Sequence, residues 1–302
     1  MRSTRLSVKV HWRRPDHNGR RKTFSLRCRG GGLKLGEKTL VMGVLNVTPD
    51  SFSDGGLFFE PAKAIEHGLK MAEEGADIID VGGESSRPGS DPLPLDEELR
   101  RVIPVIEELA SRLKIPISVD TYKSQVAERA IEAGAQMIND ISGLRFDPQM
   151  AYVAARYDSP LIIMHIKGTP KTMQQEPFYE DLMGEIIAYL HQAIEKATSA
   201  GVDPQQVIVD PGIGFGKRVQ DNLVILNRLH DLNVLGRPIL IGTSRKSFIG
   251  AVLGLEVHQR MIGTLATVAV AAMKGAHIVR VHDVAPVKQV VDMVDAIINA
   301  EV

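Results

Sequence analysis

Two basic residues near the end of the chain have the spacing of a phosphate clamp. Arg280 and His282 stand two positions apart in the segment Val279-Arg280-Val281-His282-Asp283. Side chains alternate along an extended strand, so this spacing points both toward the same side. A guanidinium that can bind two oxygens, beside an imidazole, suits a phosphate group. The alternative is a structural ion pair between Arg280 and Asp283.

A second feature that favours anions lies in Ile241-Gly242-Thr243-Ser244-Arg245-Lys246-Ser247. Here a strand pattern ends and a helix pattern begins. The free N–H groups and the positive dipole end of a helix N-terminus attract anions, and the hydroxyls of Ser244 and Ser247 add donors. This segment and the pair at 280 and 282 therefore predict one anion-binding region.

Three polar residues that end apolar runs, Asp120, Asn139 and Asp210, suit a planar heterocycle. A carboxylate accepts hydrogen bonds from ring N–H and amino groups, and an amide donates and accepts side by side. Taken singly, each residue could instead cap the next helix, as Asp120 would for a helix that starts near Lys123. Two acids and an amide at one site fit a ring rich in N–H donors, such as a guanidine-like pyrimidinone.

The segment Asp210-Pro211-Gly212-Ile213-Gly214-Phe215-Gly216-Lys217 is similar to two nucleotide-binding motifs and matches neither. Pro211 stands where a P-loop needs its first glycine, and Arg218 stands where it needs Ser or Thr. The glycine spacing also departs from the dinucleotide fingerprint. What remains is a carboxylate at a strand end, glycines that let backbone approach a flat ligand, and Phe215 to stack on that ligand. A purely structural turn is the alternative.

Two further strand ends carry polar residues. The apolar run that begins at Met42 ends in Asn46, and a loop rich in polar side chains, with Phe52 in it, follows through Gly56. This pattern predicts a strand that brings Asn46 to the rim of a sheet, followed by a functional loop. His165 also follows an apolar run, but the chain offers no partner ligand at metal-binding spacing. We expect a hydrogen-bonded histidine there and no transition-metal site.

A scaffold must bring these strand ends together, and the hydrophobic periodicity of the chain supplies one. From residue 40 onward, short β-branched runs alternate with amphipathic helical patterns. Strands are expected at 41–46, 77–81, 116–120, 136–139, 160–165, 207–210, 238–242 and 277–281. Helices are expected at 61–74, 95–113, 123–133, 148–157, 179–200, 219–231, 246–273 (broken near Gly254) and 285–299.

Eight strands alternating with eight helices predict an α/β fold of the (β/α)8 TIM-barrel class. An open doubly wound sheet is the competing architecture. The polar residues at strand ends favour the barrel, because the C-terminal ends of its strands converge on one mouth. The residues at or just beyond these ends are Asn46, Asp80, Asp120, Asn139, His165, Asp210, Ser244 and Arg280. In many barrels the phosphate site follows strands seven and eight, where 244–247 and 280–282 fall.

The first 37 residues differ in composition from the rest. They hold 11 Lys and Arg against two acids, although the whole chain of 302 residues has a net charge of −1. Strand-like alternation at 8–12 and 22–27, around a turn at 15–19, predicts a basic β-hairpin. A disordered tail and a targeting or nucleic-acid-binding arm are the alternatives. We therefore divide the chain into an N-terminal extension, 1–37, and a barrel domain, 38–302.

The remaining bulk properties exclude several classes of protein. A lone Cys28 rules out an internal disulfide framework and fits a reducing compartment. No apolar run is long enough to span a bilayer, and the N-terminus lacks the apolar segment of a secretory signal. We expect a cytoplasmic protein that binds neither membranes nor nucleic acid.

Taken together, these motifs resemble the dihydropteroate synthase family over about residues 24 to 299. Each motif alone is weak, and the set is specific. The segments that carry the resemblance are Phe24 with Arg27-Cys28-Arg29-Gly30, the segment 42–56, Asp80-Val81-Gly82-Gly83-Glu84-Ser85-Ser86-Arg87-Pro88-Gly89, Ser118-Val119-Asp120-Thr121, Ile138-Asn139-Asp140, Met164-His165, 210–217, 244–247 and 280–283.

The resemblance implies that the protein joins 6-hydroxymethyl-7,8-dihydropterin pyrophosphate to p-aminobenzoate, releasing pyrophosphate and 7,8-dihydropteroate. It also implies catalytic roles for Asp120, Lys246, Arg280 and His282, with Mg²⁺ as cofactor. The residues it implies for the pterin are Ser86, Asp120, Asn139, Asp210, Phe215 and Lys246. Those for p-aminobenzoate are Phe52, Pro88, Ser244 and Ser247. Those for pyrophosphate are Asn46, Arg280 and His282, with Asn46 also contacting the metal.

The sequence departs from the family pattern at two positions. Ser86 stands where Thr is usual and Ile213 where Phe is common. Ser86 keeps the hydroxyl and loses a methyl group, so we expect weaker packing and unchanged chemistry. The resemblance also implies a homodimer formed through the late helices. Two rival functions stay open, a methyltransferase of the same pterin-binding barrel class that uses methyltetrahydrofolate and a non-catalytic pterin-binding paralogue.

Overall fold

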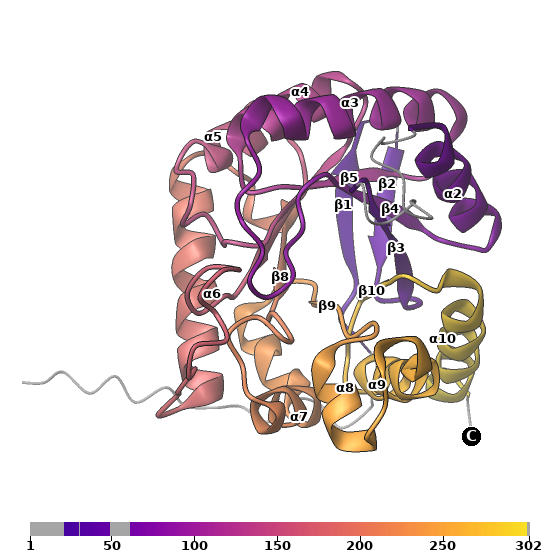
Figure 1. Cartoon of the computed structure of the whole chain (residues 1–302), viewed down its shortest axis with the longest axis vertical. Coiled ribbons are helices and arrows are strands. Elements are labelled where there is room, and N and C mark those ends of the chain that lie inside the picture. The colour runs from indigo at the N-terminus through magenta and orange to yellow at the C-terminus, as the bar shows by residue number, and fades with distance from the viewer. Residues whose placement is uncertain (1–20, 30, 49–60, 301–302) are drawn as a thin grey trace, which may run out of the picture.

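The computed structural model of the protein describes residues 21–29, 31–48 and 61–300. Eight parallel strands form one sheet in the order β8-β7-β6-β5-β4-β3-β10-β9. A parallel bridge between Val209 and Ile239 joins the two ends of this sheet and closes it into a barrel. Helices surround the strands in a ring (Figure 1). The fold is therefore the predicted (β/α)8 barrel and not an open sheet.

The eight expected barrel strands are all present, with ends that differ from expectation by one or two residues. They are β3 (Leu40–Asn46), β4 (Ile78–Gly82), β5 (Ile117–Asp120), β6 (Met137–Asp140), β7 (Leu161–Met164), β8 (Val207–Asp210), β9 (Leu240–Ile241) and β10 (Ile278–Val281).

The helices also lie where the periodicity predicted them. They are α2 (Pro61–Glu73), α3 (Leu95–Arg112), α4 (Ser124–Glu132), α5 (Met150–Arg156), α6 (Leu182–Ser199), α7 (Val219–Asn227), α8 (Ser247–Leu253), α9 (Met261–Met273) and α10 (Val284–Ile298). Short 3-10 helices occupy Pro204–Gln206, Leu229–Leu235 and Val257–Gln259. The expected helix 246–273 is broken at Gly254, which has a positive φ of 68°. None of the described helices is long and apolar enough to cross a membrane.

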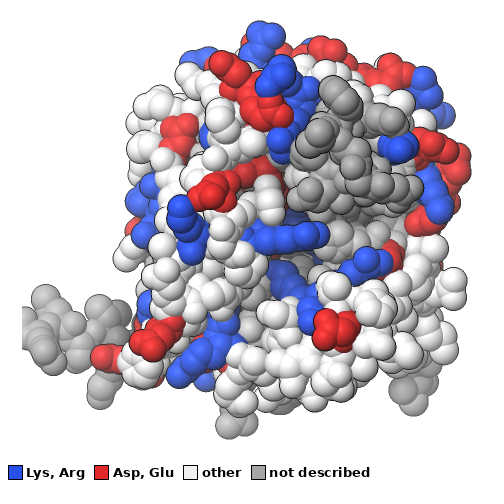
Figure 2. Space-filling model, in the orientation of Figure 1, with Lys and Arg blue, Asp and Glu red and all other residues white. Residues whose placement is uncertain are grey.

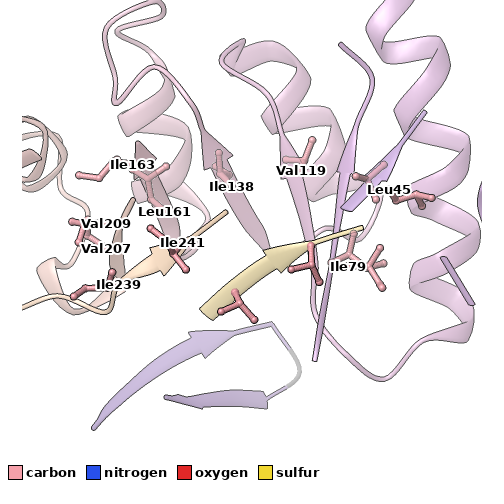
Figure 3. Close-up of a cluster of buried hydrophobic side chains, with 14 of the residues drawn as sticks. Leu45, Ile79, Val119, Ile138, Leu161, Ile163, Val207, Val209, Ile239 and Ile241 are labelled. Atoms are coloured by element: carbon pink, nitrogen blue, oxygen red, sulfur yellow. The ribbon is translucent and has the colours of Figure 1, made fainter. Parts of the chain in front are cut away.

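Period-two alternation sorts the strand residues into two sets. The outward set packs between the sheet and the helices, as Leu45, Ile79 and Val119 do in Figure 3. The inward set is apolar in the N-terminal half of the barrel, where Met42, Ile78, Met137, Ile162, Ile208, Leu240 and Ile278 share one cluster. Two residues further along several strands the inward positions become polar. The fold thus separates a dry floor from a polar mouth.

An antiparallel hairpin closes the N-terminal end of the barrel. Its strands are β1 (Phe24–Cys28) and β2 (Gly31–Leu35), paired from Phe24 opposite Leu35. Leu26 and Leu35 are buried in the same cluster as the inward apolar residues of the barrel. The strand expected at 22–27 is thus present, but its described partner is β2. The partner expected at 8–12 lies outside the described residues.

Candidate active site

An open cavity lies at the C-terminal end of the barrel, with about 400 Å³ of empty space that extends into the solvent. Figure 2 shows Lys and Arg side chains gathered around a hollow in the middle of this face. Because several strand ends contribute to it, residues far apart in sequence meet there. The lining residues are Val44, Asn139, Ile141, Met164, Asp210, Phe215, Gly242, Ser244, Lys246, Arg280 and His282.

Arg280 on β10 bridges two carboxylates. Its Nε donates to Oδ2 of Asp80 over 2.6 Å, and its Nη2 donates to Oδ2 of Asp120 over 2.5 Å. Asp283, the partner considered in the alternative interpretation, pairs instead with Arg245. The alternative interpretation, a structural ion pair between Arg280 and Asp283, is therefore wrong. The barrel brings Arg280 to acids that lie 160 and 200 residues earlier in the chain.

Asp80 is the central residue of this network, and it was absent from the candidate site residues. Its side chain is fully buried, and its Oδ2 also accepts a hydrogen bond from Nδ2 of Asn139 over 3.0 Å. Asp80 thereby orients both Arg280 and Asn139. The signal in the sequence was an acid inside the apolar strand Ile78–Gly82, because a buried charge needs a partner.

The pair of carboxylates around one guanidinium has an electrostatic consequence. Burial raises the pKa of Asp120 to about 7, while the positive charge of Arg280 opposes this rise. Asp120 therefore gains and loses a proton near neutral pH. Its side chain bonds Arg280 and does not cap α4, whose N-cap is Lys123 without a side-chain hydrogen bond. The capping alternative for Asp120 is wrong.

His282 follows the last residue of β10, and its side chain faces the same cavity as that of Arg280, as the spacing predicted. Both line the cavity. Nδ1 of His282 lies 2.9 Å from Oγ of Ser244. Burial and the charge of Arg280 lower the pKa of His282 to about 4, so its imidazole is neutral near pH 7. An arriving anion would favour its protonated form.

Asp210, Phe215 and Lys246 also line the cavity. Nζ of Lys246 lies 4.6 Å from the centroid of the Phe215 ring and donates to the carbonyl oxygen of Ile213. Burial lowers the pKa of Lys246 to about 8 and raises that of Asp210, and each charge opposes the shift of the other. A carboxylate, an ammonium group and an aromatic face thus meet on one wall.

Two glycines of the segment 210–217 are required by packing against protein backbone. Gly212 has φ of 69°, and a Cβ there would lie 2.0 Å from the carbonyl oxygen of His165. At Gly216, with φ of 65°, a Cβ would lie 2.5 Å from the carbonyl oxygen of Lys167. These two glycines therefore let the loop after β8 pack against the loop after β7, so the close approach is to protein backbone.

A second pocket of about 240 Å³ adjoins the first. Asp120 and Ser86 line it, and Ile141 lines both pockets. The ion pair between Asp120 and Arg280 connects the two. The other lining residues are Glu84, Ser85, Glu98, Thr121 and Tyr122.

Three of the described candidate residues line neither pocket. Pro88 and Ser247 are exposed, on the loop after β4 and at the start of α8, and Asn46 is half-buried at the end of β3. Phe52 lies outside the described residues. The loop residues were placed by resemblance alone, whereas strand-end positions follow from the alternation of side chains.

His165 is a buried, hydrogen-bonded histidine, as expected. Its Nδ1 lies 2.9 Å from Nζ of Lys217, and its ring packs edge-on against Tyr189 with 4.7 Å between centroids. Among the described residues, no group of three or more His, Cys, Asp or Glu side chains has an arrangement that could hold a metal ion.

The mouth of the barrel combines buried acids and an amide with a basic anion site. This combination is typical of an enzyme whose substrate is a nitrogen-rich ring that carries a charged group. Residues 42–282 match the family described as pterin-binding enzymes. The chain is 48% identical over 277 residues to a dihydropteroate synthase of Bacillus subtilis, covering 92% of this chain and 95% of that relative. The chain belongs to the pterin-binding enzymes and, among them, to the dihydropteroate synthases.

Two solved structures agree with this relationship. A dihydropteroate synthase of Yersinia pestis in a sulfonamide drug complex superposes with a TM-score of 0.87 at 43% identity, covering 92% of this chain and 100% of that one. A dihydropteroate synthase of Xanthomonas albilineans in complex with 7,8-dihydropteroate gives a TM-score of 0.82 at 41% identity, covering 92% and 100%.

Proposed function

We propose that the protein condenses 6-hydroxymethyl-7,8-dihydropterin pyrophosphate with p-aminobenzoate to give 7,8-dihydropteroate and pyrophosphate. The observation that carries this proposal is a single cavity lined both by Asn139 and Asp210 and by Arg280 and His282. A ring rich in N–H donors matches the first pair, and an anionic leaving group matches the second. The reaction breaks the bond from the methylene carbon to the pyrophosphate oxygen, forms a C–N bond and releases the amine proton.

The pterin ring would occupy the cavity between Phe215 and the strand ends. Asp210 accepts from the ring N–H and amino groups, and Asn139, held by Asp80, supplies a fixed amide. Lys246 lies above the Phe215 ring, where its ammonium can donate to a ring oxygen or nitrogen. Ser86 and Asp120 would contact the pterin from the second pocket.

Loss of pyrophosphate would be the step that the basic residues assist. Negative charge grows on the leaving oxygen while positive charge grows on the pterin methylene. Arg280 and His282 stabilise the first, and the Asp120 carboxylate offsets the second, each preorganised donor contributing about 3–4 kcal/mol in comparable sites. Ser244 holds the imidazole of His282 in place through its hydroxyl.

The described residues fit a magnesium ion that arrives with the substrate. Mg²⁺ keeps several waters and is commonly held by one or two protein oxygens together with substrate phosphates. Asn46, at the end of β3, offers one amide oxygen, and the described residues contain no carboxylate cluster that would hold the ion alone. When bound, Mg²⁺ would neutralise charge on the pyrophosphate oxygens.

Purified protein with both substrates and Mg²⁺ should release pyrophosphate and form 7,8-dihydropteroate, measured by a coupled assay and by mass spectrometry. A methyltransferase would instead transfer a methyl group from methyltetrahydrofolate and leave pyrophosphate unformed. A non-catalytic paralogue would bind a pterin and release nothing. Absence of both products from folded, pterin-binding protein would reject the proposed reaction.

The loop between β4 and α3 carries Ser86 and Pro88, two of the residues proposed for substrate contact, and Glu84 holds its base. Glu84 accepts from the Tyr122 hydroxyl over 2.6 Å and from the Leu93 N–H over 3.0 Å, and it pairs with Lys123. Replacing Glu84 by Gln removes the charge that holds both ends of the loop. We expect the KM for p-aminobenzoate to rise about tenfold through Pro88, equivalent to about 1.4 kcal/mol, and the KM for the pterin substrate to rise as well through Ser86.

Glu108→Gln is the matched control, because Glu108 pairs with Arg112 in the last turns of α3, away from this loop. Steady-state kinetics with each substrate varied in turn measures both values. Unchanged KM values in Glu84→Gln, or equal increases in Glu108→Gln, would contradict a role for Glu84 in holding the loop.

Pyrophosphate should promote binding of the second substrate. The proposed p-aminobenzoate site combines Ser244, which lines the anion-binding cavity, with Phe52 and Pro88 on loops. Anion binding at Arg280 and His282 would order those parts of the site, so ligand affinity should depend on it. We expect calorimetry to give at least about tenfold tighter binding of a sulfonamide with pyrophosphate and Mg²⁺ present. Equal affinity without them would reject this coupling.

A homodimer and a cytoplasmic location complete the proposal. Late helices expose large apolar side chains, including Ile262 at 79% and Met273 at 64% on α9. Such a surface supports self-association, which sedimentation at several concentrations would test. The single cysteine supports a reducing compartment, which fractionation would test.

A further inference from the structure

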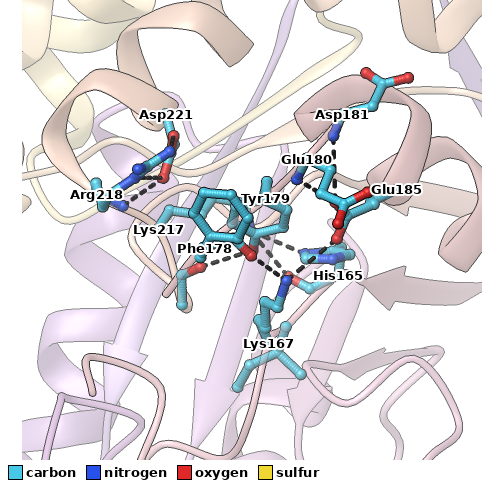
Figure 4. Close-up of polar contacts among 12 residues, drawn as sticks. His165, Lys167, Phe178, Tyr179, Glu180, Asp181, Glu185, Lys217, Arg218 and Asp221 are labelled. Atoms are coloured by element: carbon cyan, nitrogen blue, oxygen red, sulfur yellow. Dashed lines mark hydrogen bonds and ion pairs between the residues drawn. The ribbon is translucent and has the colours of Figure 1, made fainter. Parts of the chain in front are cut away.

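Lys217 is a buried lysine that the proposed reaction does not use. It is 3% exposed and belongs to the loop after β8. Phe215 on the same loop lines the cavity, whereas Lys217 does not. Its Nζ lies 2.9 Å from Nδ1 of His165 and 3.0 Å from the carbonyl oxygen of Phe215. Figure 4 shows Lys217 and His165 among the polar contacts that join the loops after β7 and β8.

Nζ of Lys217 contacts groups of both loops. Three described groups lie within hydrogen-bond distance of it, namely Nδ1 of His165, the Phe215 carbonyl and, at 3.5 Å, the His165 carbonyl. An ammonium group fits this geometry with Nδ1 as the acceptor, and a neutral amine fits it with Nδ1–H as the donor. Burial lowers the pKa of both Lys217 and His165, while the carboxylates of Asp210 and Asp221 oppose this shift at Lys217 and favour its ammonium form.

The two loops that Lys217 joins pack backbone against backbone. Gly212 and Gly216 place backbone of the β8 loop directly against the carbonyl oxygens of His165 and Lys167. The Tyr179 hydroxyl donates to the Gly216 carbonyl over 2.6 Å at the same junction. Lys217 therefore lies in a closely packed junction, and a change at its Nζ would reach Phe215 through the carbonyl that it holds.

Lys217 also acts on Asp210 through charge. Burial disfavours the ionised carboxylate of Asp210, and the positive charge of Lys217 lowers the pKa of this group. Lys246 does the same from the cavity side, where it bonds the Ile213 carbonyl of the same loop. One lysine thus lies on each side of the loop that presents Asp210 and Phe215.

We propose that Lys217 is a positioning residue for the pterin substrate, one that holds the Phe215 wall and keeps Asp210 ionised from behind the cavity, with His165 holding its ammonium in place. This inference rests on the proposed function, because it takes Asp210 and Phe215 as pterin contacts. Lys217 itself is not among the residues that line the cavity.

Other charged groups face this assembly and belong in any account of its pH dependence. Arg280 faces Asp210 from β10, and Asp221 and Lys167 face Lys217 from α7 and from the loop after β7. Arg145 and Lys167 face His165, with the hydroxyl-bearing rings of Tyr179 and Tyr189 packed against it.

The test compares the wild-type protein with Lys217→Met, which keeps the length of the side chain and removes the charge. The probe is 6-hydroxymethylpterin, measured by calorimetry from pH 5.5 to 8.5, alongside steady-state kinetics. We expect pterin affinity at pH 7.5 to fall about tenfold or more, with the KM for p-aminobenzoate changed less than about twofold. We also expect affinity to decline with falling pH at a higher pH than in wild type, because Asp210 protonates earlier.

Two histidine variants keep the test decisive if Lys217→Met folds poorly. His165→Leu removes an acceptor of Lys217, and His277→Leu removes an equally buried histidine that accepts from the Ile239 N–H at the opposite end of the barrel. We expect pterin affinity to fall and its pH dependence to shift in His165→Leu, with both unchanged in His277→Leu.

Either His165→Leu or folded Lys217→Met binding the pterin within about twofold of wild type, with an unchanged pH dependence, would overturn the inference. If His165→Leu and His277→Leu weakened pterin binding equally, the effect would be a general loss of stability, and the inference would also be overturned. A wild-type protein that neither binds the pterin nor forms 7,8-dihydropteroate would instead reject the proposed function itself.

Discussion

Replacement of Arg280 by Met is expected to lower kcat about 1000-fold, the upper range for loss of one preorganised donor at a site of developing charge. The guanidinium lies at the cavity beside His282, where negative charge would grow on the departing pyrophosphate. His282 alone cannot replace it, because burial holds the pKa of this imidazole near 4 in the free protein. Single-turnover measurements with saturating pterin substrate would separate this loss from weaker binding.

The same substitution should also destabilise the barrel. Arg280 is the cation between Asp80 and Asp120, and its removal leaves Asp80 fully buried without its ionic partner. Breaking a buried pair in this way costs about 3–5 kcal/mol in comparable proteins. Denaturant unfolding should therefore show a marked loss for Arg280→Met.

The double variant Asp80→Asn with Arg280→Met distinguishes the two effects. Removing the buried charge should restore much of the stability, because an asparagine can still accept from Nδ2 of Asn139. Turnover should stay low, since the cavity still lacks the guanidinium. If stability and turnover recovered together, Arg280 would be structural and the proposed role in pyrophosphate release would be wrong.

The positions of the barrel strands could be predicted from sequence because each depends on local information. A run such as Leu40–Asn46 carries both its strand propensity and the alternation that sends Val44 and Asn46 inward. The same logic predicted that Arg280 and His282 share one side of β10, and both line the cavity. Strand-end residues of a barrel meet at one mouth, so Asn139 and Asp210 were also predictable as neighbours.

Partners that come from distant strands could not be predicted in this way. Nothing near Arg280 in sequence indicates that its acids are Asp80 and Asp120, because the pairing depends on barrel closure and register. The roles of Gly212 and Gly216 were likewise hidden, since a glycine shows the need for space but not which neighbour fills it. Loop residues such as Pro88 lack any periodicity that would place them.

Replacement of Asp120 by Asn is expected to lower kcat about 100-fold while changing the KM for the pterin substrate only a few-fold. The carboxylate would offset positive charge that exists on the pterin only as pyrophosphate leaves, so its loss raises the barrier more than it weakens binding. Asparagine keeps the shape of the side chain and can still accept from Arg280, which limits rearrangement of the ion pair.

The pH profile makes this prediction specific to Asp120. Burial raises its pKa to about 7, so the ionised fraction, and with it kcat/KM of the wild type, should fall as pH drops through that value. The limb near pH 7 should be missing in Asp120→Asn. Asp140→Asn is the matched control, because Asp140 is a buried carboxylate at the end of the neighbouring strand β6 but accepts from the Ser142 and Leu144 N–H groups and lines neither pocket. That variant should lose stability and keep the limb. Two results would contradict this role for Asp120: a kcat of Asp120→Asn within about threefold of wild type, or an unchanged fall of kcat/KM near pH 7. The acid that offsets the charge would then be another residue of the cavity, and Asp210 would be the first to test.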